Sequence, residues 1–119
     1  MEVVEERRRL REKAVGVASN WARKIPFKAT VILIGSYARG DFNLWSDIDV
    51  LLISEDFKGG PVGRLKSLDM PPNFQIIPLT PSEFQRLLMK KNPLAVEAIK
   101  SGIILRNDLK FITSTRGGE

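Results

Sequence analysis

Two aspartates separated by one residue, Asp47 and Asp49, stand at the start of an apolar run and form the most chemically suggestive pair in the chain. Residues two apart in a strand point to the same face, so both carboxylates would project together. Carboxylates held this close repel each other unless a cation lies between them. Mg²⁺ suits this position, because it binds few protein carboxylates and completes its coordination with water and phosphate oxygens. The pattern predicts a site for one or two magnesium ions, although two solvated acids at a strand start would look the same.

A second candidate feature is the pair Gly35-Ser36, which follows another apolar run. Glycine lets the backbone approach a ligand closely, and the amides and the Ser36 hydroxyl can hold phosphate oxygens if a helix begins here. Arg39 has two interpretations, a phosphate contact or an ion pair with Asp41 on the same loop. A Gly-Ser pair after a strand is most often only a turn, so it gains weight only in combination with the acids.

The elements that must position these residues are predicted from hydrophobic periodicity. Runs rich in β-branched residues predict strands at 29–34, 48–53 and 74–79, and Pro78 places the third at a sheet edge or a strand end. Helical spacing predicts helices at 3–25, 80–91 and 93–101, with a short helical piece at 64–68 and a last short strand at 103–105. We expect an α/β fold, a small mixed β-sheet of three to four strands covered by helices on one face.

The length of 119 residues corresponds to one domain. Within it we distinguish the N-terminal helix 3–25, a core at 29–90, and a C-terminal helix and short strand at 93–112. The core ends in a helix whose start is well marked. Thr80 as N-cap, Pro81 in the first helical position and Glu83 three residues after the cap form a capping box.

The composition excludes several kinds of chemistry. The chain has no cysteine and no histidine, so it cannot use a thiol nucleophile, a Ser-His pair or a zinc site built on these residues. The longest apolar run, 29–34, is far shorter than the ~20 residues of a membrane span, and the lack of cysteine fits a cytoplasmic protein. The net charge of +5 leaves a small nucleic-acid-binding protein as an alternative. With one Tyr and two Trp, however, the chain is poorly equipped for base stacking.

The combined pattern is more specific than its parts. Gly35-Ser36, ten further residues, and then Asp47 and Asp49, with apolar strands on both sides, resembles the minimal nucleotidyltransferase (MNT) family of the DNA polymerase β-like superfamily. The resemblance implies that Gly35 and Ser36 hold nucleotide phosphates, with Arg39 as a further phosphate contact. It also implies that Asp47 and Asp49 are the catalytic metal ligands. Ser46, by contrast, is interpreted as capping the turn before the strand.

One departure from that family concerns the third acid, which the family places on the next strand. The corresponding segment here is Phe74-Gln75-Ile76, so the third metal position is an amide that carries no charge. The nearest spare carboxylates in the sequence are Asp69 and Glu55, and neither lies in the expected strand. A lost ligand or base typically costs ~10²-fold or more in rate. An alternative is therefore a catalytically weakened module that binds nucleotide or a partner.

The resemblance implies an enzyme that binds Mg-NTP, with ATP as the expected nucleotide, and transfers a nucleoside monophosphate, AMP, to a hydroxyl on a partner protein. Small chains of this family resemble the antitoxin of a HEPN/MNT toxin-antitoxin pair, whose partner is helical. Surfaces that could bind such a partner are the N-terminal helix and the apolar residues Phe84, Leu87, Leu88 and Met89, although these also fit an internal core. The sequence leaves the oligomeric state open.

Overall fold

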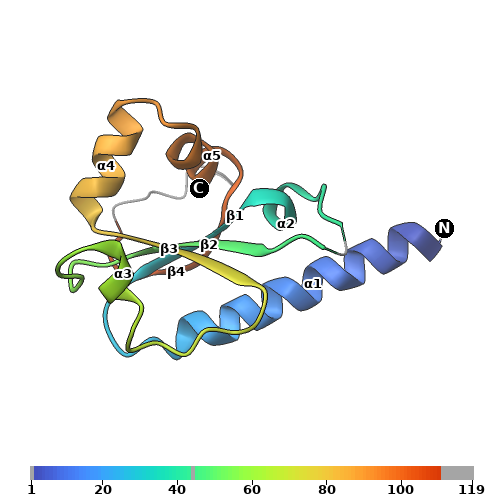
Figure 1. Ribbon diagram of the computed structural model, residues 1–119. Helices are drawn as coiled ribbons and strands as arrows, with labels where there is room; N and C mark the ends of the chain where they lie inside the picture. The colour runs from blue at the N-terminus through green and yellow to red at the C-terminus, as the bar shows by residue number, and fades with distance from the viewer. Residues whose placement is uncertain (1, 44, 111–119) are drawn as a thin grey trace.

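The computed structural model describes residues 2–43 and 45–110. In chain order its elements are α1 (Glu2–Arg23), β1 (Thr30–Ile34), α2 (Gly35–Arg39), β2 (Ile48–Ile53), α3 (Pro61–Arg64), β3 (Phe74–Leu79), α4 (Pro81–Met89), α5 (Pro93–Ser101) and β4 (Ile103–Asn107) (Figure 1). None of the helices in these two ranges combines the length and hydropathy needed to span a bilayer.

The four strands form one sheet in the order β3-β2-β1-β4. β1 pairs antiparallel with both β2 and β4, whereas β2 and β3 run parallel. This confirms the predicted α/β fold with a small mixed sheet. Pro78 lies near the end of the edge strand β3, where a residue without a backbone N–H can be accommodated.

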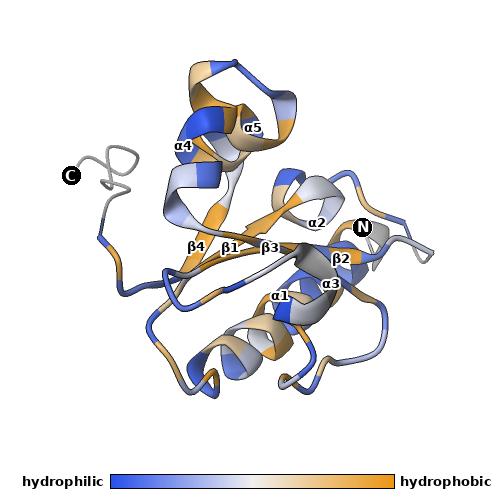
Figure 2. Ribbon diagram, turned by 60° about the vertical axis from the view of Figure 1, so that its left-hand side comes forward, coloured by the Kyte–Doolittle hydropathy of each residue, from blue (hydrophilic) through white to orange (hydrophobic). Residues whose placement is uncertain are grey.

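Helices cover both faces of the sheet, so the prediction of coverage on one face is wrong. On one face, Val31 and Leu33 of β1 pack in a cluster with Trp21 and Ala22 of α1. On the other face, the alternate residues of β1 and β2 pack against α4 and α5 through Phe84, Ala95 and Ala98. Figure 2 shows the apolar strands between these helices and α1. The physical reason was present in the sequence, since near-continuous apolar runs are typical of strands buried on both faces.

The element boundaries differ from the predictions at several ends. α1 ends at Arg23 rather than residue 25, consistent with the bias against helix before Pro26. β4 extends to Asn107, two residues beyond the predicted strand, and the short helix α3 overlaps the predicted piece at 64–68 only at Arg64. The last residues of the predicted C-terminal segment, 111 and 112, lie outside the described residues.

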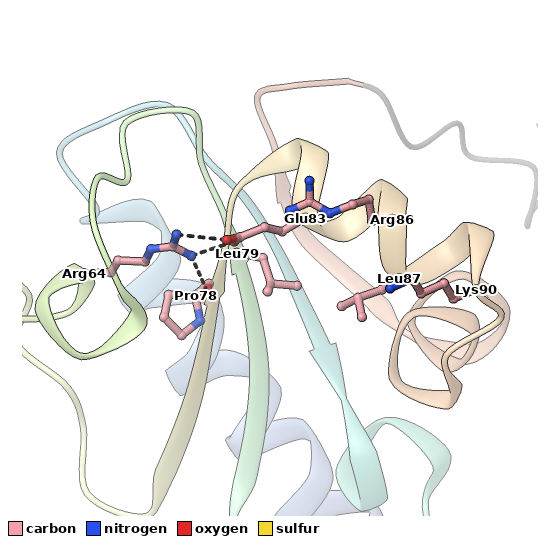
Figure 3. A pocket seen from close by; sticks show the side chains of 7 residues that line it. All are labelled: Arg64, Pro78, Leu79, Glu83, Arg86, Leu87 and Lys90. Carbon is pink, nitrogen blue, oxygen red and sulfur yellow. Dashed lines mark hydrogen bonds and ion pairs between the residues drawn. The ribbon is translucent and has the colours of Figure 1, made fainter.

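An arginine fastens α3 to the start of α4 (Figure 3). The guanidinium of Arg64 donates to both carboxylate oxygens of Glu83, at 2.7 and 3.1 Å, and to the Pro78 carbonyl at 3.1 Å. Glu83 also accepts from the Thr80 amide at 2.9 Å, while the Thr80 hydroxyl accepts from the Glu83 amide, so the predicted capping box is confirmed. These bonds, led by the one from Arg64, lower the pKa of Glu83 to about 2.

Candidate functional site

The turn from β1 into α2 brings the Gly-Ser bend directly against Asp49. Ile34, the last residue of β1, pairs with Asp49 of β2, so the next residue along, Gly35, lies beside that aspartate. Gly35 has a φ of +77°, and a Cβ on it would lie 2.5 Å from Oδ2 of Asp49. Only glycine fits this position, because a side chain would meet both the left-handed backbone and the carboxylate.

A pocket of about 320 Å³ opens at this point. It brings together five of the residues singled out from the sequence, in a wall completed by Ile34, Ile77, Leu94 and Glu97: Gly35, Ser36, Arg39, Asp49 and Gln75. Asp47 does not line this pocket and is exposed just before β2 begins. It is nevertheless close enough to Asp49 for the two carboxylates to interact.

The surroundings of Asp49 disfavour the negative charge of its carboxylate. Its pKa is raised, first by partial burial and then by repulsion from Asp47 and Glu97, while Arg39 acts in the opposite direction. An acid whose ionised form is disfavoured in this way gains from a nearby cation. A cation close to Asp49 would therefore stabilise its ionised form.

Glu97, which no sequence motif indicated, reaches the bend from α5. Its Oε2 accepts from the Gly35 amide at 2.9 Å and from Nη1 of Arg39 at 2.7 Å. Arg39 also pairs with Asp41 at 3.2 Å, which was one of its two predicted roles. Glu97 is the one acid in the segment 93–101, and that isolation was the only sequence signal. The expected spare carboxylates, Asp69 and Glu55, do not line the pocket.

Comparison with known proteins assigns the family. A family model, nucleotidyltransferase domain, matches residues 16–112, which is most of the chain. This protein belongs to the nucleotidyltransferase domain family. A crystal structure of a candidate nucleotidyltransferase from Sulfolobus solfataricus has the same fold, with a TM-score of 0.55 and 22% identity, over 87% of this chain and 86% of that one. No curated protein matches this chain significantly.

In this nucleotidyltransferase domain, Gln75 lies beside Asp49 in the parallel register of β2 and β3. Residues paired in this way share a face of the sheet, so the amide stands where the third acid was expected. In the described ranges, no group of three or more acidic, histidine or cysteine side chains could hold a metal ion. Of the oxygen groups around Asp49, the Glu97 carboxylate is bonded to the Gly35 amide and to Arg39, which leaves Asp47, Asp49 and the neutral Gln75 amide as candidate ligands for Mg²⁺. This set fits an ion that takes its remaining ligands from water and phosphate.

Two arginines of α1 bind backbone carbonyls of α2 and of the loop that follows it. Nε and Nη2 of Arg11 donate to the carbonyls of Tyr37 and Ala38 at 2.8 and 2.7 Å. Arg7 donates to the carbonyls of Gly40 and Phe42. Arg7 therefore faces the protein rather than solvent. The next two residues, Arg8 and Arg9, instead form exposed ion pairs with Glu5 and Glu6, three positions earlier on the helix.

The turn before β2 is closed by local hydrogen bonds. The Ser46 hydroxyl accepts from the Asn43 amide at 2.9 Å, and the Asn43 side chain accepts from the Trp45 amide at 2.8 Å. The capping role predicted for Ser46 is consistent with this geometry. The turn is followed directly by Asp47, the residue before the first residue of β2.

Proposed function

We propose that this nucleotidyltransferase domain binds Mg-NTP, with ATP as the preferred nucleotide, and transfers AMP to a protein hydroxyl. The observation that carries the proposal is the contact between the Gly35 bend and the Asp49 carboxylate, in one pocket with Ser36 and Arg39. A triphosphate in this pocket would find hydroxyl, amide and guanidinium donors on one side and carboxylates on the other. The reaction forms a bond from the acceptor oxygen to the α-phosphorus and breaks the bond to pyrophosphate, and the hydroxyl proton leaves to solvent.

The residues of the pocket divide this work. Ser36 and Arg39 bind phosphate oxygens and orient the triphosphate, while Asp47 and Asp49 hold Mg²⁺ with the Gln75 oxygen as a neutral neighbour. When bound, Mg²⁺ supplies positive charge against the phosphates and the departing pyrophosphate. The raised pKa of Asp49 supports this assignment, because the ion would relieve the repulsion that raises it.

The acceptor is proposed to be a hydroxyl on a helical HEPN-type partner, with this chain as the antitoxin of the pair. The resemblance to minimal nucleotidyltransferases supports this proposal. Of the apolar residues considered for partner contact, Met89 at the end of α4 is 83% exposed, whereas Phe84 is 1% exposed and belongs to the core. Leu87 and Leu88 are partly buried against the core.

A second candidate is a module that binds nucleotide without efficient turnover. The observation that favours it is the Gln75 amide beside Asp49, where a carboxylate was expected. Replacing Gln75→Glu separates the two candidates. If the amide limits an existing reaction, the variant should release pyrophosphate faster, by about tenfold or more. An unchanged rate in a folded variant would contradict the idea that the missing acid limits turnover.

The direct test uses ATP labelled at the α-phosphate, Mg²⁺, and the purified chain with and without cell extract. We expect label to move onto a protein only when Mg²⁺ is present. Asp49→Asn should slow the transfer by about 10²-fold or more, and label appearing equally with that variant would refute the proposed site. Magnesium-dependent binding of ATP without pyrophosphate release would favour the binding module.

A further inference from the structure

A carboxylate of the protein itself occupies the donors that the proposed function assigns to phosphate. Oε2 of Glu97 accepts from the Gly35 amide at 2.9 Å and from Nη1 of Arg39 at 2.7 Å. Both donors line the same pocket as Ser36 and Asp49. A carboxylate oxygen and a phosphate oxygen are alike in charge and acceptor geometry, so the same pair of donors suits either one.

The two anions cannot use the bend together. A backbone amide has one hydrogen, and the Gly35 hydrogen is directed at Glu97. Arg39 is committed as well, since its Nε pairs with Asp41 at 3.2 Å while Nη1 pairs with Glu97. A phosphate that accepts from the Gly35 amide must therefore take the place of the Glu97 oxygen.

Charge opposes simultaneous occupancy in the same way. The pocket wall contains two carboxylates, Asp49 and Glu97, and one cation, Arg39. A triphosphate brings several further negative charges, and Mg²⁺ offsets them on the side of the aspartates. At the bend, the approaching phosphate meets the Glu97 carboxylate at hydrogen-bonding distance, where like charges repel strongly.

We infer that the Glu97 side chain is an internal placeholder for a nucleotide phosphate, which holds the bend in the free protein and is displaced when the triphosphate binds. The inference rests on the proposed function and adds to it a residue that sets nucleotide affinity. Rotation of one partly exposed side chain is sufficient, because the Glu97 side chain keeps 26% of its surface accessible. Displacement breaks a charge-assisted contact, so affinity is lower than the donors alone would give.

The test compares the wild-type chain with Glu97→Gln, which keeps the shape and removes the charge, and Glu97→Ala, which removes both. Isothermal titration measures binding of Mg-ATP, Mg-tripolyphosphate and adenosine to each protein. We expect both variants to bind the two triphosphates about tenfold more tightly, the equivalent of one charge-assisted contact no longer broken. Adenosine binding should not change, because adenosine carries no phosphate.

Glu5→Gln is the matched control, because Glu5 lies in an exposed ion pair on α1 and its loss changes the net charge by the same amount. This variant should leave the triphosphate affinity nearly unchanged. Thermal unfolding of the ligand-free proteins provides the second measurement. A placeholder stabilises the free bend, so Glu97→Gln should lower Tm while it tightens triphosphate binding. A purely structural contact would weaken both together.

The remaining outcomes would overturn the placeholder role of Glu97 alone, or both that role and the proposed function. Wild-type binding of Mg-ATP with equal or weaker binding by both Glu97 variants would overturn the placeholder and leave the proposed function standing. An equal gain in Glu5→Gln would also overturn it, since net charge would explain the effect. Failure of wild-type and both Glu97 variants to bind any triphosphate would overturn both proposals.

Discussion

At the scale of single residues, the site depends on a close approach that only one amino acid allows. Gly35 brings its backbone against the Asp49 carboxylate, and the two candidate ligand groups, one for phosphate and one for metal, thereby share a pocket. This close approach explains the spacing of the Gly-Ser pair and the two aspartates in the sequence. The bend follows the end of β1, and the two aspartates lie at the start of β2. The antiparallel pairing of these strands brings the end of β1 beside the start of β2.

Replacing Gly35→Ala tests this approach. The new Cβ would lie 2.5 Å from Oδ2 of Asp49 and would also strain the left-handed backbone, so the variant should lose magnesium-dependent nucleotide binding as well as stability. Gly59→Ala is the matched control, because Gly59 has a similar φ of +73° with nothing within 4 Å of the added carbon. That control should lose only the backbone penalty of about 1–2 kcal/mol. Equal nucleotide affinity in the two variants would argue against the close approach as a feature of the site.

Replacing Asp49→Asn has opposite effects on function and on stability. The folded protein raises the pKa of Asp49, so the ionised form, dominant at pH 7, is less favourable in the folded chain than in the unfolded one. Removing the charge should therefore raise the Tm of the ligand-free protein, measured by thermal unfolding at pH 7. The same variant should lose about 10²-fold or more in transfer rate. A lower Tm together with unchanged magnesium affinity would remove the basis for a metal role.

At the scale of elements, the predictable parts were those with local causes. The strands at 48–53 and 74–79 follow from β-branched apolar runs, and the start of α4 follows from the Thr80 capping box. Glu97 was not predictable, because α5 reaches the bend only through tertiary packing that leaves no local pattern. The contacts of Arg7 were not predictable for the same reason, since its acceptors lie more than thirty residues away along the chain.

The clamp between α3 and α4 predicts a specific acid sensitivity. The Glu83 pKa is lowered from 4.5 to about 2, so its ionised form stabilises the folded chain above pH 4.5. That contribution should decline as the pH falls from 4.5 toward 2. In denaturant unfolding, Glu83→Gln should be less stable than wild type at pH 6, and the difference should shrink across this range. A difference that stays constant with pH would show that the Arg64 pair is not its source.

At the scale of the whole molecule, the N-terminal helix α1 is connected to the candidate site by hydrogen bonds to α2. α1 packs on one face of the sheet, while α5 brings Glu97 to the bend from the opposite face. α2 lies between them. Arg11 of α1 donates to two of its carbonyls, and Glu97 of α5 accepts from its first amide, that of Gly35. We expect changes in α1 to alter nucleotide affinity through these carbonyl contacts.

Arg11→Ala tests this coupling. Arg11 donates to the carbonyls of Tyr37 and Ala38, and their loss should destabilise the fold by about 1–3 kcal/mol and weaken nucleotide binding by loosening the segment that carries Ser36 and Arg39. Arg9→Ala removes the same charge from the same helix, but the ion pair of Arg9 with Glu6, at 3.8 Å, is exposed. Thermal unfolding and titration with Mg-ATP compare the two variants. If both weaken binding equally, the effect belongs to the net positive charge that attracts the polyanion, whereas a loss confined to Arg11→Ala shows that α1 positions the bend.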